Sequence, residues 1–414
     1  MEVLHSRCAG LDVHKKTVVA CARCVEGREV RHHVRTFGTT TKELLALCEW
    51  LEQQGCTHVA MEATGVYWKP VWHMLEGHFE LVLGNAAHLK NVPGRKTDKN
   101  DAMWIADLMA HGLIRSSLVP TEPIQQLRDL TRTRKQLVRE SSQHVQRIQK
   151  VLEDANLKLD NVISDVVGVT GNAILQAIIE GETDPQKLAS LAHKQLKCSR
   201  EQLAEALHGK VTAHHRLLLR LHLQTYKQLQ QSITELEAHI EQHIRPFFEK
   251  VELLKTIPGI GDATAHVLAA EIGLDMSRFP TDAHLRSWAG LCPGNDESAG
   301  KRRSTRLRHG APWLKTTLVQ AAWAVTRSKK TYFNARYHRI RGRRGHKKAV
   351  VAVAASMLTS VYHVLRTGMP YRDLGPDHYA RRNTKKSADK LVRQLKALGM
   401  KVEIVGSVEA SPAT

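Results

Sequence analysis

Four carboxylates in the first quarter of the chain have residue types and a spacing that suit metal-dependent phosphodiester chemistry. Asp12 lies in an apolar stretch, residues 9–13, and Glu62 directly follows another, residues 57–61. Asp98 and Asp101 are three residues apart, so on one helix they would share a face. A charge inside an apolar strand is costly unless it serves a task. Four such carboxylates can hold two divalent cations, Mg²⁺ or Mn²⁺, about 4 Å apart, to activate a nucleophile and stabilise a leaving oxygen.

Each of these carboxylates, taken singly, also has a structural explanation. Asp98 could cap the N-terminus of a helix, and Asp12 could be a turn residue. Taken together, at these positions and in this order, they favour the metal site of a nuclease or a strand-transfer enzyme.

The surrounding sequence predicts a mixed α/β domain that would position the four carboxylates. Its segments alternate in the order βββ-α-β-α-β-α, which is that of RuvC and RNase H-like folds. The predicted strands are residues 9–13, 17–22, 30–36, 57–61 and 79–83, and the predicted helices are residues 40–54, 66–75 and 98–111. Asp12 then lies on the first strand, Glu62 at the end of the fourth, and Asp98 and Asp101 at the start of the last helix.

After Pro120 the pattern becomes helical. Two long segments, 124–157 and 211–244, have narrow apolar stripes, which predicts either an antiparallel, coiled-coil-like pair or a plain helical spacer. Shorter helices are expected around 172–180, 185–193 and 199–207. We therefore predict four parts: the α/β domain at 1–116, a helical middle at 117–250, a mostly helical basic domain at 251–372, and a polar tail at 373–414 with one helix.

The charge of the chain indicates a polyanionic partner. Lys and Arg number 61 against 41 Asp and Glu, which gives a formal net charge of +20. Residues 298–372 contain 18 Lys and Arg and no acidic residue, so salt-sensitive binding to nucleic acid is expected there. Ala349–Leu365 is an uncharged run of 17 residues, shorter than the roughly 20 that span a bilayer. It predicts a buried helix, and no membrane partner is expected.

Two turns in the basic half are expected to contact phosphate or DNA. The turn at 257–261, with Gly259 and Gly261, matches a helix-hairpin-helix motif, although a plain helix–helix turn is the alternative. Ser298 is predicted on a loop before basic residues, with Ser304 as its rival, and either hydroxyl needs activation to act as a nucleophile. The expected nucleic-acid contacts are Gly259, Gly261, Lys301, Arg302, Arg303, Arg306, Arg308, Arg343 and Arg344.

Seven cysteines in 414 residues indicate a reducing compartment without a disulfide framework. The N-terminus has no basic region followed by an apolar run, so no secretory signal is expected. Cys21 and Cys24 form a CxxC, and a zinc site could recruit Cys8, Cys48, or His32 and His33. Ordinary strand and core cysteines are the alternative.

Together these motifs resemble one family, the DEDD-type insertion-sequence transposases related to the pilin-gene invertase and known as bridge-RNA-guided recombinases. The matching segments are residues 10–15, 61–65 and 96–101, the turn at 257–261, and 290–293 followed by Ser298. They occur in the family's order over most of the chain. The family serine is commonly followed by Gly-Gly, whereas Ala299-Gly300 follows here.

The resemblance implies a transposase that cuts and rejoins DNA. It makes Asp12, Glu62, Asp98 and Asp101 the metal-binding tetrad of a RuvC-like domain, and Ser298 the nucleophile that bonds to DNA phosphate. It also implies a homo-oligomer, dimer or tetramer, holding donor and target double-stranded DNA. A structured noncoding guide RNA would select the sites by base pairing, in the cytoplasm of a prokaryote near its nucleoid.

Two other functions remain open from the sequence. One is a stand-alone, metal-dependent junction-resolving endonuclease of the RuvC type, which uses water and forms no covalent intermediate. The other is a non-catalytic nucleic-acid-binding protein with a vestigial tetrad. A trapped protein–DNA adduct would distinguish recombination from the first, and metal-dependent cleavage of any kind would eliminate the second.

Overall fold

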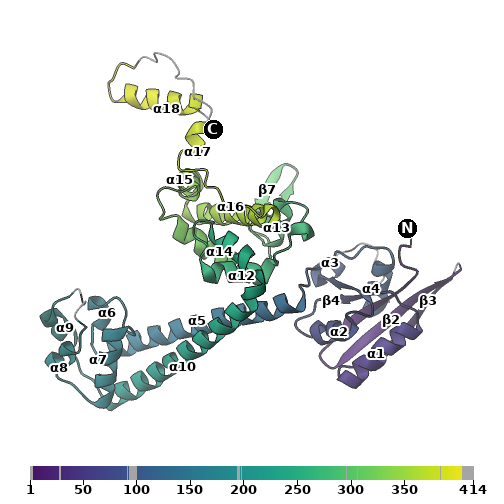
Figure 1. The fold of residues 1–414 in the computed structure, drawn as a ribbon, viewed down its shortest axis with the longest axis horizontal. Helices are drawn as coiled ribbons and strands as arrows, with labels where there is room; N and C mark the ends of the chain where they lie inside the picture. Colours follow the sequence, from purple (N-terminus) through teal and green to yellow (C-terminus); the bar gives the residue numbers. More distant parts are fainter. Residues whose placement is uncertain are drawn as a thin grey trace. The chain divides into compact units, whose positions relative to one another are not determined.

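The computed structural model describes residues 3–402 except 28, 91, 93–99, 194–195, 197, 295, 305 and 383. The chain divides into two compact units, Met1–Pro120 and Thr121–Thr414 (Figure 1). Apolar cores form within each of them. The sequence-predicted Asp98 lies outside the described residues.

The first unit is built on a mixed five-stranded sheet with the order β3-β2-β1-β4-β5. Its strands are β1 (Arg7–Val13), β2 (Thr17–Glu26), β3 (Glu29–Gly38), β4 (His58–Glu62) and β5 (Glu80–Gly84). The β1-β2 and β2-β3 pairs are antiparallel, and the β1-β4 and β4-β5 pairs are parallel. Its helices are α1 (Thr41–Gln53), α2 (Trp68–Leu75), α3 (Ala86–Lys90) and α4 (Asp101–Ala110). This confirms the predicted element order, with the short α3 as an addition.

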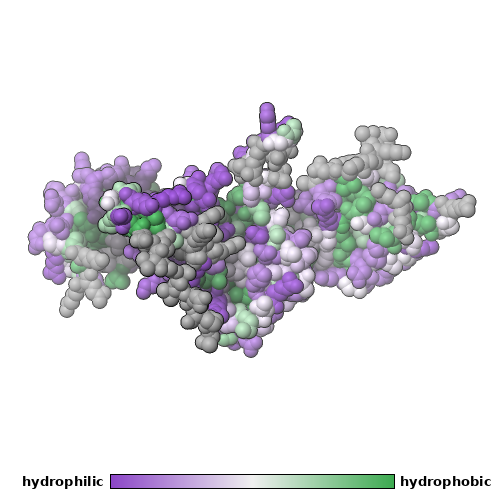
Figure 2. Space-filling model, turned by 90° about the horizontal axis from the view of Figure 1, so that it is seen from above, coloured by the Kyte–Doolittle hydropathy of each residue, from purple (hydrophilic) through white to green (hydrophobic). Residues whose placement is uncertain are grey.

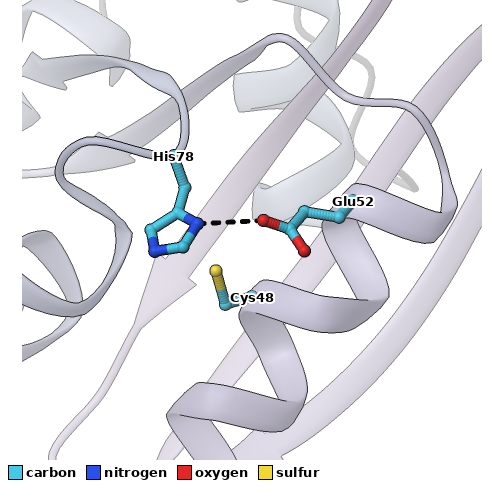
Figure 3. Close-up of side chains that lie close together, drawn as sticks. All are labelled: Cys48, Glu52 and His78. Carbon is cyan, nitrogen blue, oxygen red and sulfur yellow. Dashed lines mark hydrogen bonds and ion pairs between the residues drawn. The ribbon is translucent and has the colours of Figure 1, made fainter.

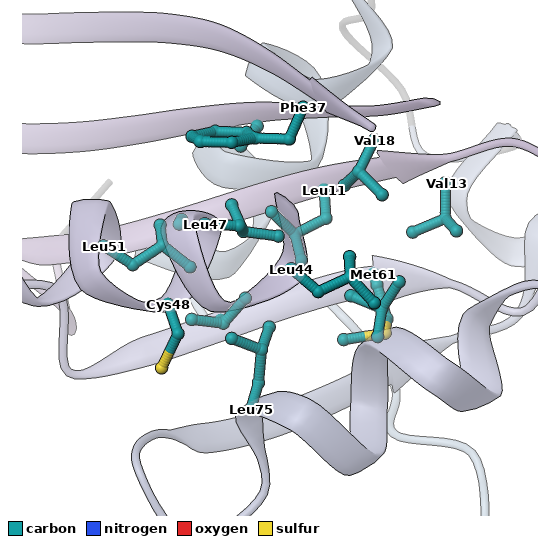
Figure 4. Packing of buried hydrophobic residues seen from close by; sticks show 14 of the residues in the cluster. Leu11, Val13, Val18, Phe37, Leu44, Leu47, Cys48, Leu51, Met61 and Leu75 are labelled. Carbon is teal, nitrogen blue, oxygen red and sulfur yellow. The ribbon is translucent and has the colours of Figure 1, made fainter. Parts of the chain in front are cut away.

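Helices pack on both faces of this sheet, because its central strands are apolar on both sides. One core lies between the sheet and helices α1 and α2 (Figure 4). Its members on β1 are Ala9, Leu11 and Val13. Cys8 and Ala60 belong instead to a core with residues of α4. Since side chains alternate along a strand, Gly10 and Asp12 share the α4 face with Cys8.

The second unit begins with two long helices, α5 (Glu122–Asp154) and α10 (Ala213–Ile244), which lie side by side (Figure 1). They are antiparallel: His215 near the start of α10 contacts Asp154 at the end of α5, and Gln230 donates to Ser141. The predicted antiparallel pair is confirmed. The connecting helices are α6 (Leu159–Val162), α7 (Val169–Glu180), α8 (Pro185–Ser190) and α9 (Arg200–Ala206), and they share one core with the pair.

The rest of this unit is helical, and α11, α13, α14 and α15 pack around α16 (His346–Thr367). The others are η1 (Arg245–Phe247), α11 (Phe248–Lys255), α12 (Asp262–Ile272), η2 (Met276–Arg278), α13 (Asp282–Trp288), α14 (Pro312–Val325), α15 (Tyr332–Arg344), α17 (His378–Arg382) and α18 (Thr384–Ala397). A short hairpin of β6 (Asp296–Ser298) and β7 (Lys301–Ser304) precedes α14. In the described part of the chain, α16 alone has the length and apolarity of a membrane span. Ten of its residues are nevertheless buried, which confirms the predicted buried helix.

A buried ion pair joins α5 to these helices. The carboxylate of Glu271 on α12 is 2% exposed, and Arg132 donates to its two oxygens at 2.7 and 2.8 Å. Arg128 donates to the backbone carbonyls of Ala270 and Glu271. A bidentate contact between an arginine and a buried carboxylate fixes the positions of the two helices that carry them. Removal of the arginine would leave the buried carboxylate unpaired.

Candidate functional site

Two of the predicted carboxylates lie at neighbouring strand ends in the first unit. The parallel register of β1 and β4 pairs Leu11 with Met61, so Asp12 and Glu62 follow in step at the carboxyl ends of both strands. Both belong to the α4 face of the sheet, since Cys8 and Ala60 of the same strands do. The carboxyl ends of adjacent parallel strands are a usual place for a binding site in α/β sheets.

Both side chains remain accessible enough to bind a ligand. Asp12 is 20% exposed, and its Oδ2 is 3.1 Å from Nε2 of the more exposed His14. Glu62 is half-buried and accepts a hydrogen bond of 3.2 Å from the hydroxyl of Thr64. These partners hold the carboxylates in place without covering them.

Asp101 is the first residue of α4, which begins three positions later than the sequence-predicted start at Asp98. Asn100 is the cap: its backbone is extended, with ψ 142°, and its side chain accepts from the N–H of Ala102 at 3.0 Å. Because this capping conformation is not helical, α4 begins at Asp101. Asp98 lies outside the described residues, so a shared face with Asp101 stays a prediction. Asp101 instead lies where the positive end of the helix dipole favours a carboxylate.

Gly10 brings α4 against β1, two residues before Asp12. A Cβ at this position would lie 2.3 Å from the carbonyl oxygen of Ala102 and 2.3 Å from the nitrogen of Ala106. Only a residue without a side chain permits this approach. Gly10 therefore sets the distance between the strand with Asp12 and the helix that begins at Asp101.

A polar contact also fixes α4 on the sheet. Arg23 of β2 is 4% exposed, and its Nε donates to Oδ1 of Asp107 at 3.1 Å. His32 of β3 approaches the same oxygen at 3.1 Å.

Cys21, one member of the predicted CxxC, packs against Ala102 of α4, and burial raises its pKa to about 12. The described cysteines are free thiols, and Cys21 is a core residue.

Replacing Gly10 by alanine is expected to destabilise the protein by about 1–3 kcal/mol, because α4 must move away from β1. Strand cleavage should decrease by more than the loss of folded protein explains, since Asp101 moves with the helix. Chemical unfolding with and without the substitution measures the first effect. Gly342→Ala is the control: this glycine lies inside α15 with open space around it, so alanine there should be neutral or stabilising. Equal stability of Gly10→Ala and the wild type would contradict the packing argument.

The donors of this site suit a hard cation. Carboxylate oxygens are the ligands that Mg²⁺ and Mn²⁺ prefer. Among the described residues, one group of three possible metal ligands has all its donor atoms within 4.8 Å of one another. It consists of Cys48, Glu52 and His78, not of the predicted carboxylates. This does not conflict with a site for two ions, because carboxylates around a pair of cations are spread over both.

Ser298 lies in the second unit, where the predicted loop is a short hairpin and Ser298 is next to its turn. It ends β6 and pairs with Lys301 of β7, so Ala299 and Gly300 form a two-residue turn with φ of 51° and 72°. Positive φ at both positions is typical of a tight hairpin turn and favours glycine. Ala299 therefore holds a conformation in which Gly would be easier, at the position where the resembling family has glycine.

The two serines of this hairpin differ in their surroundings. Ser298 is exposed at the turn, whereas Ser304 is half-buried and its hydroxyl oxygen accepts the backbone N–H of Arg306 at 3.1 Å. A hydroxyl at an exposed turn is easier for a large substrate to reach. By exposure, Ser298 is therefore the better candidate for a nucleophile, and Ser304 remains its rival.

The predicted basic contacts are mostly on the surface. Lys301, Arg303, Arg306, Arg308, Arg343 and Arg344 are exposed. The side chain of Arg302 lies outside the described residues. Figure 2 shows hydrophilic side chains over much of the visible surface, with hydrophobic ones in smaller areas between them.

The turn at 257–261 joins α11 to α12, which suits both a helix-hairpin-helix motif and a plain helix–helix turn. Gly259 has φ 86°, and a Cβ there would lie 3.0 Å from Val325 on α14, so this glycine serves internal packing. Gly261 caps α12 with open space around it. The next residue, Asp262, pairs with Lys255 at 2.7 Å and already places a carboxylate at the helix N-terminus. Phosphate binding by this turn stays a prediction.

Comparison with known proteins agrees with these features. Residues 9–157 match the IS110-type DEDD transposases, and residues 251–338 match the transposase family IS116/IS110/IS902. The chain is 24% identical over 386 residues to the pilin gene-inverting protein of Moraxella bovis, covering 87% of this chain and 96% of that protein.

Two shorter matches come from insertion elements. A protein of insertion element IS110 from Streptomyces coelicolor is 32% identical over 128 residues, which is 30% of this chain and 31% of that protein. The transposase of element IS1328 from Yersinia enterocolitica is 35% identical over 108 residues, 26% of this chain and 31% of that protein. The chain belongs to the IS110 family of DNA transposases, enzymes that cut and rejoin DNA.

Proposed function

We propose that the first unit is a RuvC-like domain whose Asp12, Glu62, Asp98 and Asp101 bind two Mg²⁺ or Mn²⁺ ions for DNA strand cleavage. The observation that supports this most is the register that places Asp12 beside Glu62 at neighbouring strand ends. When bound, such ions lower the pKa of an attacking hydroxyl and stabilise the leaving oxygen. Asp101, at the start of α4, faces the same side of the sheet as these two residues.

The attacking group in this proposal is the hydroxyl of Ser298. Its Oγ forms a bond to a DNA phosphorus while one P–O bond of the strand breaks, and the serine proton passes to the departing oxygen. Attack by a strand hydroxyl on the phosphoserine reverses these changes and joins the new strand without an energy source. The nearby Lys301 and Arg303 would offset the charge on the phosphate during attack.

The carboxylates and the serine belong to different units, so the proposal requires that the two units meet around DNA. We propose that they do so between protomers of a dimer or tetramer that holds donor and target DNA. After the α/β domain at 1–116, the proposed parts are the helical middle at 117–250, the basic domain with Ser298 at 251–372, and the tail at 373–414.

The basic domain would bind nucleic acid backbone, and a structured noncoding RNA would select the sites by base pairing. Residues 298–372 have 18 basic and no acidic residues, which suits recognition of phosphates without reading of bases. We propose that this takes place in the prokaryotic cytoplasm, at the nucleoid. Sequencing RNA that co-purifies with the chain tests the guide directly.

Charge reversal at Arg343 and Arg344 is expected to weaken binding to duplex DNA at every sequence. Both side chains are exposed in the last turn of α15, next to Lys347 and Lys348. If each contacts one phosphate, the slope of log affinity against log salt should become smaller by about two.

The matched control for this prediction reverses Arg200 and Lys210, which are exposed in the helical middle and change the net charge equally. Fluorescence anisotropy over a range of salt concentrations measures both variants. Equal salt slopes in the two variants would mean that net charge, and not the basic domain, governs binding.

One assay separates this function from a junction-resolving endonuclease. Purified full-length chain is mixed with Mg²⁺, DNA of the element ends and the co-purifying RNA, and the products are run under denaturing conditions with and without protease. Protein-linked DNA that protease converts to free DNA supports recombination through a covalent intermediate. Cleaved DNA without any linked protein supports the endonuclease.

A further inference from the structure

A second group of metal-ligand side chains lies on the first unit, away from the carboxylates. Cys48 and Glu52 are one turn apart on α1, and His78 lies in the turn between α2 and β5 (Figure 3). Their donor atoms lie within 4.8 Å of one another. Nδ1 of His78 and Oε1 of Glu52 are 2.9 Å apart. Helix α1 covers the sheet face opposite to α4, so this group is separate from Asp12 and Glu62.

The chemical types of the three donors select the class of ion. A thiolate sulfur, an imidazole nitrogen and a carboxylate oxygen are the ligands of Zn²⁺, whereas Mg²⁺ takes oxygen ligands and leaves thiols alone. Typical zinc distances are about 2.3 Å to sulfur and about 2.0 Å to nitrogen or oxygen. The Glu52 and His78 donors, now 2.9 Å apart, would therefore separate by a few tenths of an ångström to share one ion. The same three residues would be unsuited to the ions of the catalytic carboxylates.

The local fold holds these donors in place before any ion binds. Cys48 is 5% exposed and belongs to the core beneath α1. Gly77 has φ 90°, and the N–H of His78 donates to the carbonyl of Leu75, so a tight turn presents the imidazole to α1. The side chains of Glu52 and His78 are 51% and 52% exposed, which leaves the outer side of the group open to water.

We propose that Cys48, Glu52 and His78 bind one Zn²⁺ with a water molecule as fourth ligand. Binding replaces the thiol proton of Cys48, which leaves to solvent, and converts the Glu52–His78 contact into two metal bonds. The ion would connect the end of α1 to the turn before β5 and stabilise that edge of the sheet.

Cobalt binding to the full-length chain tests this proposal without an activity assay. Co²⁺ is titrated in excess Mg²⁺, which occupies oxygen-only sites, and the near-ultraviolet sulfur-to-cobalt charge-transfer band is recorded. We expect one equivalent of Co²⁺ to produce the band and Zn²⁺ to remove it. His78→Gln and Glu52→Gln should each weaken binding by about 100-fold or more, since even residues behind the ligands change affinity by roughly 10–100-fold.

The controls exclude other ions and other thiols. Asp12→Asn should keep the band, because it alters the carboxylate site alone, and Cys198→Ser should keep it because that thiol is remote in sequence and belongs to the other unit. Cys48→Ser should abolish it. Because Cys48 is buried and its substitution can unfold the sheet, the exposed His78 and Glu52 variants decide the result.

Thermal unfolding gives a second measurement. Saturating Zn²⁺ should raise the melting temperature of the wild type but not that of His78→Gln, since only a folded state with the site gains the binding energy. Absence of the charge-transfer band in the wild type, or an unchanged band in His78→Gln, would overturn the proposal.

Discussion

Replacing Asp12 by asparagine is expected to reduce DNA strand cleavage by about a thousandfold, which corresponds to roughly 4 kcal/mol of lost transition-state stabilisation. The amide keeps the shape of the side chain but removes the charge that would hold a divalent cation. Among the described residues, the contact that Asp12 makes is the hydrogen bond with His14, whose imidazole is 58% exposed, so the fold should be intact. Gel-based cleavage of end-labelled DNA in Mg²⁺ measures the effect.

The matched control for this variant is Glu80→Gln. Glu80 is an exposed carboxylate at the start of β5, so it lies at the opposite end of the parallel strands from Asp12 and Glu62. Its loss should leave cleavage unchanged. Full activity of Asp12→Asn, or full activity of the wild type in excess chelator, would contradict the metal site.

Replacing Ser298 by alanine is expected to eliminate both the protein–DNA adduct and the recombinant product, to below about one part in a thousand of the wild-type yield. Binding should stay within about twofold, because the side chain is exposed and the basic residues remain. The adduct is measured as DNA retained with protein in denaturing gels, and binding by fluorescence anisotropy.

Ser304→Ala distinguishes a nucleophile from a hairpin residue. The Ser304 hydroxyl accepts the N–H of Arg306, so its loss should cost about 1 kcal/mol locally but should leave the adduct in place. If Ser304→Ala loses the adduct and Ser298→Ala keeps it, the roles of the two serines are reversed.

The sheet could be predicted from the sequence because its strands are apolar runs between turns. The sequence indicated β2 as residues 17–22, yet it continues to Glu26. The extension was hidden because the charged Arg23 interrupts the apolar run in the sequence. In the folded chain Arg23 is buried by pairing with Asp107, a partner 84 positions away that no local pattern reveals.

The site could be predicted in part. Strand-end positions for Asp12 and Glu62 follow from local pattern, but the start of α4 depends on Asn100, whose capping competes with the aspartates nearby. The importance of Gly10 appears only when α4 is folded against it. The spacing of Cys48 and Glu52 is visible on α1, but the contribution of His78 needs the tertiary fold.

The hairpin with Ser298 was not predicted because its strands are three and four residues long and mainly polar. Without alternating apolar residues, such strands leave only a turn signal in the sequence. The exposed position of Ser298 and the hydrogen bond that the Ser304 hydroxyl accepts are therefore known from the structure alone.

Peptide mapping of the trapped adduct identifies the residue that bonds to DNA. Wild-type chain is incubated with Mg²⁺, RNA and DNA, the covalent product is digested with protease and nuclease, and the nucleotide-bearing peptide is sequenced by mass spectrometry. We predict a phosphodiester link to the hydroxyl of Ser298. A link at Ser304 or at any other residue, or cleaved DNA with no linked peptide, would show that Ser298 is not the nucleophile.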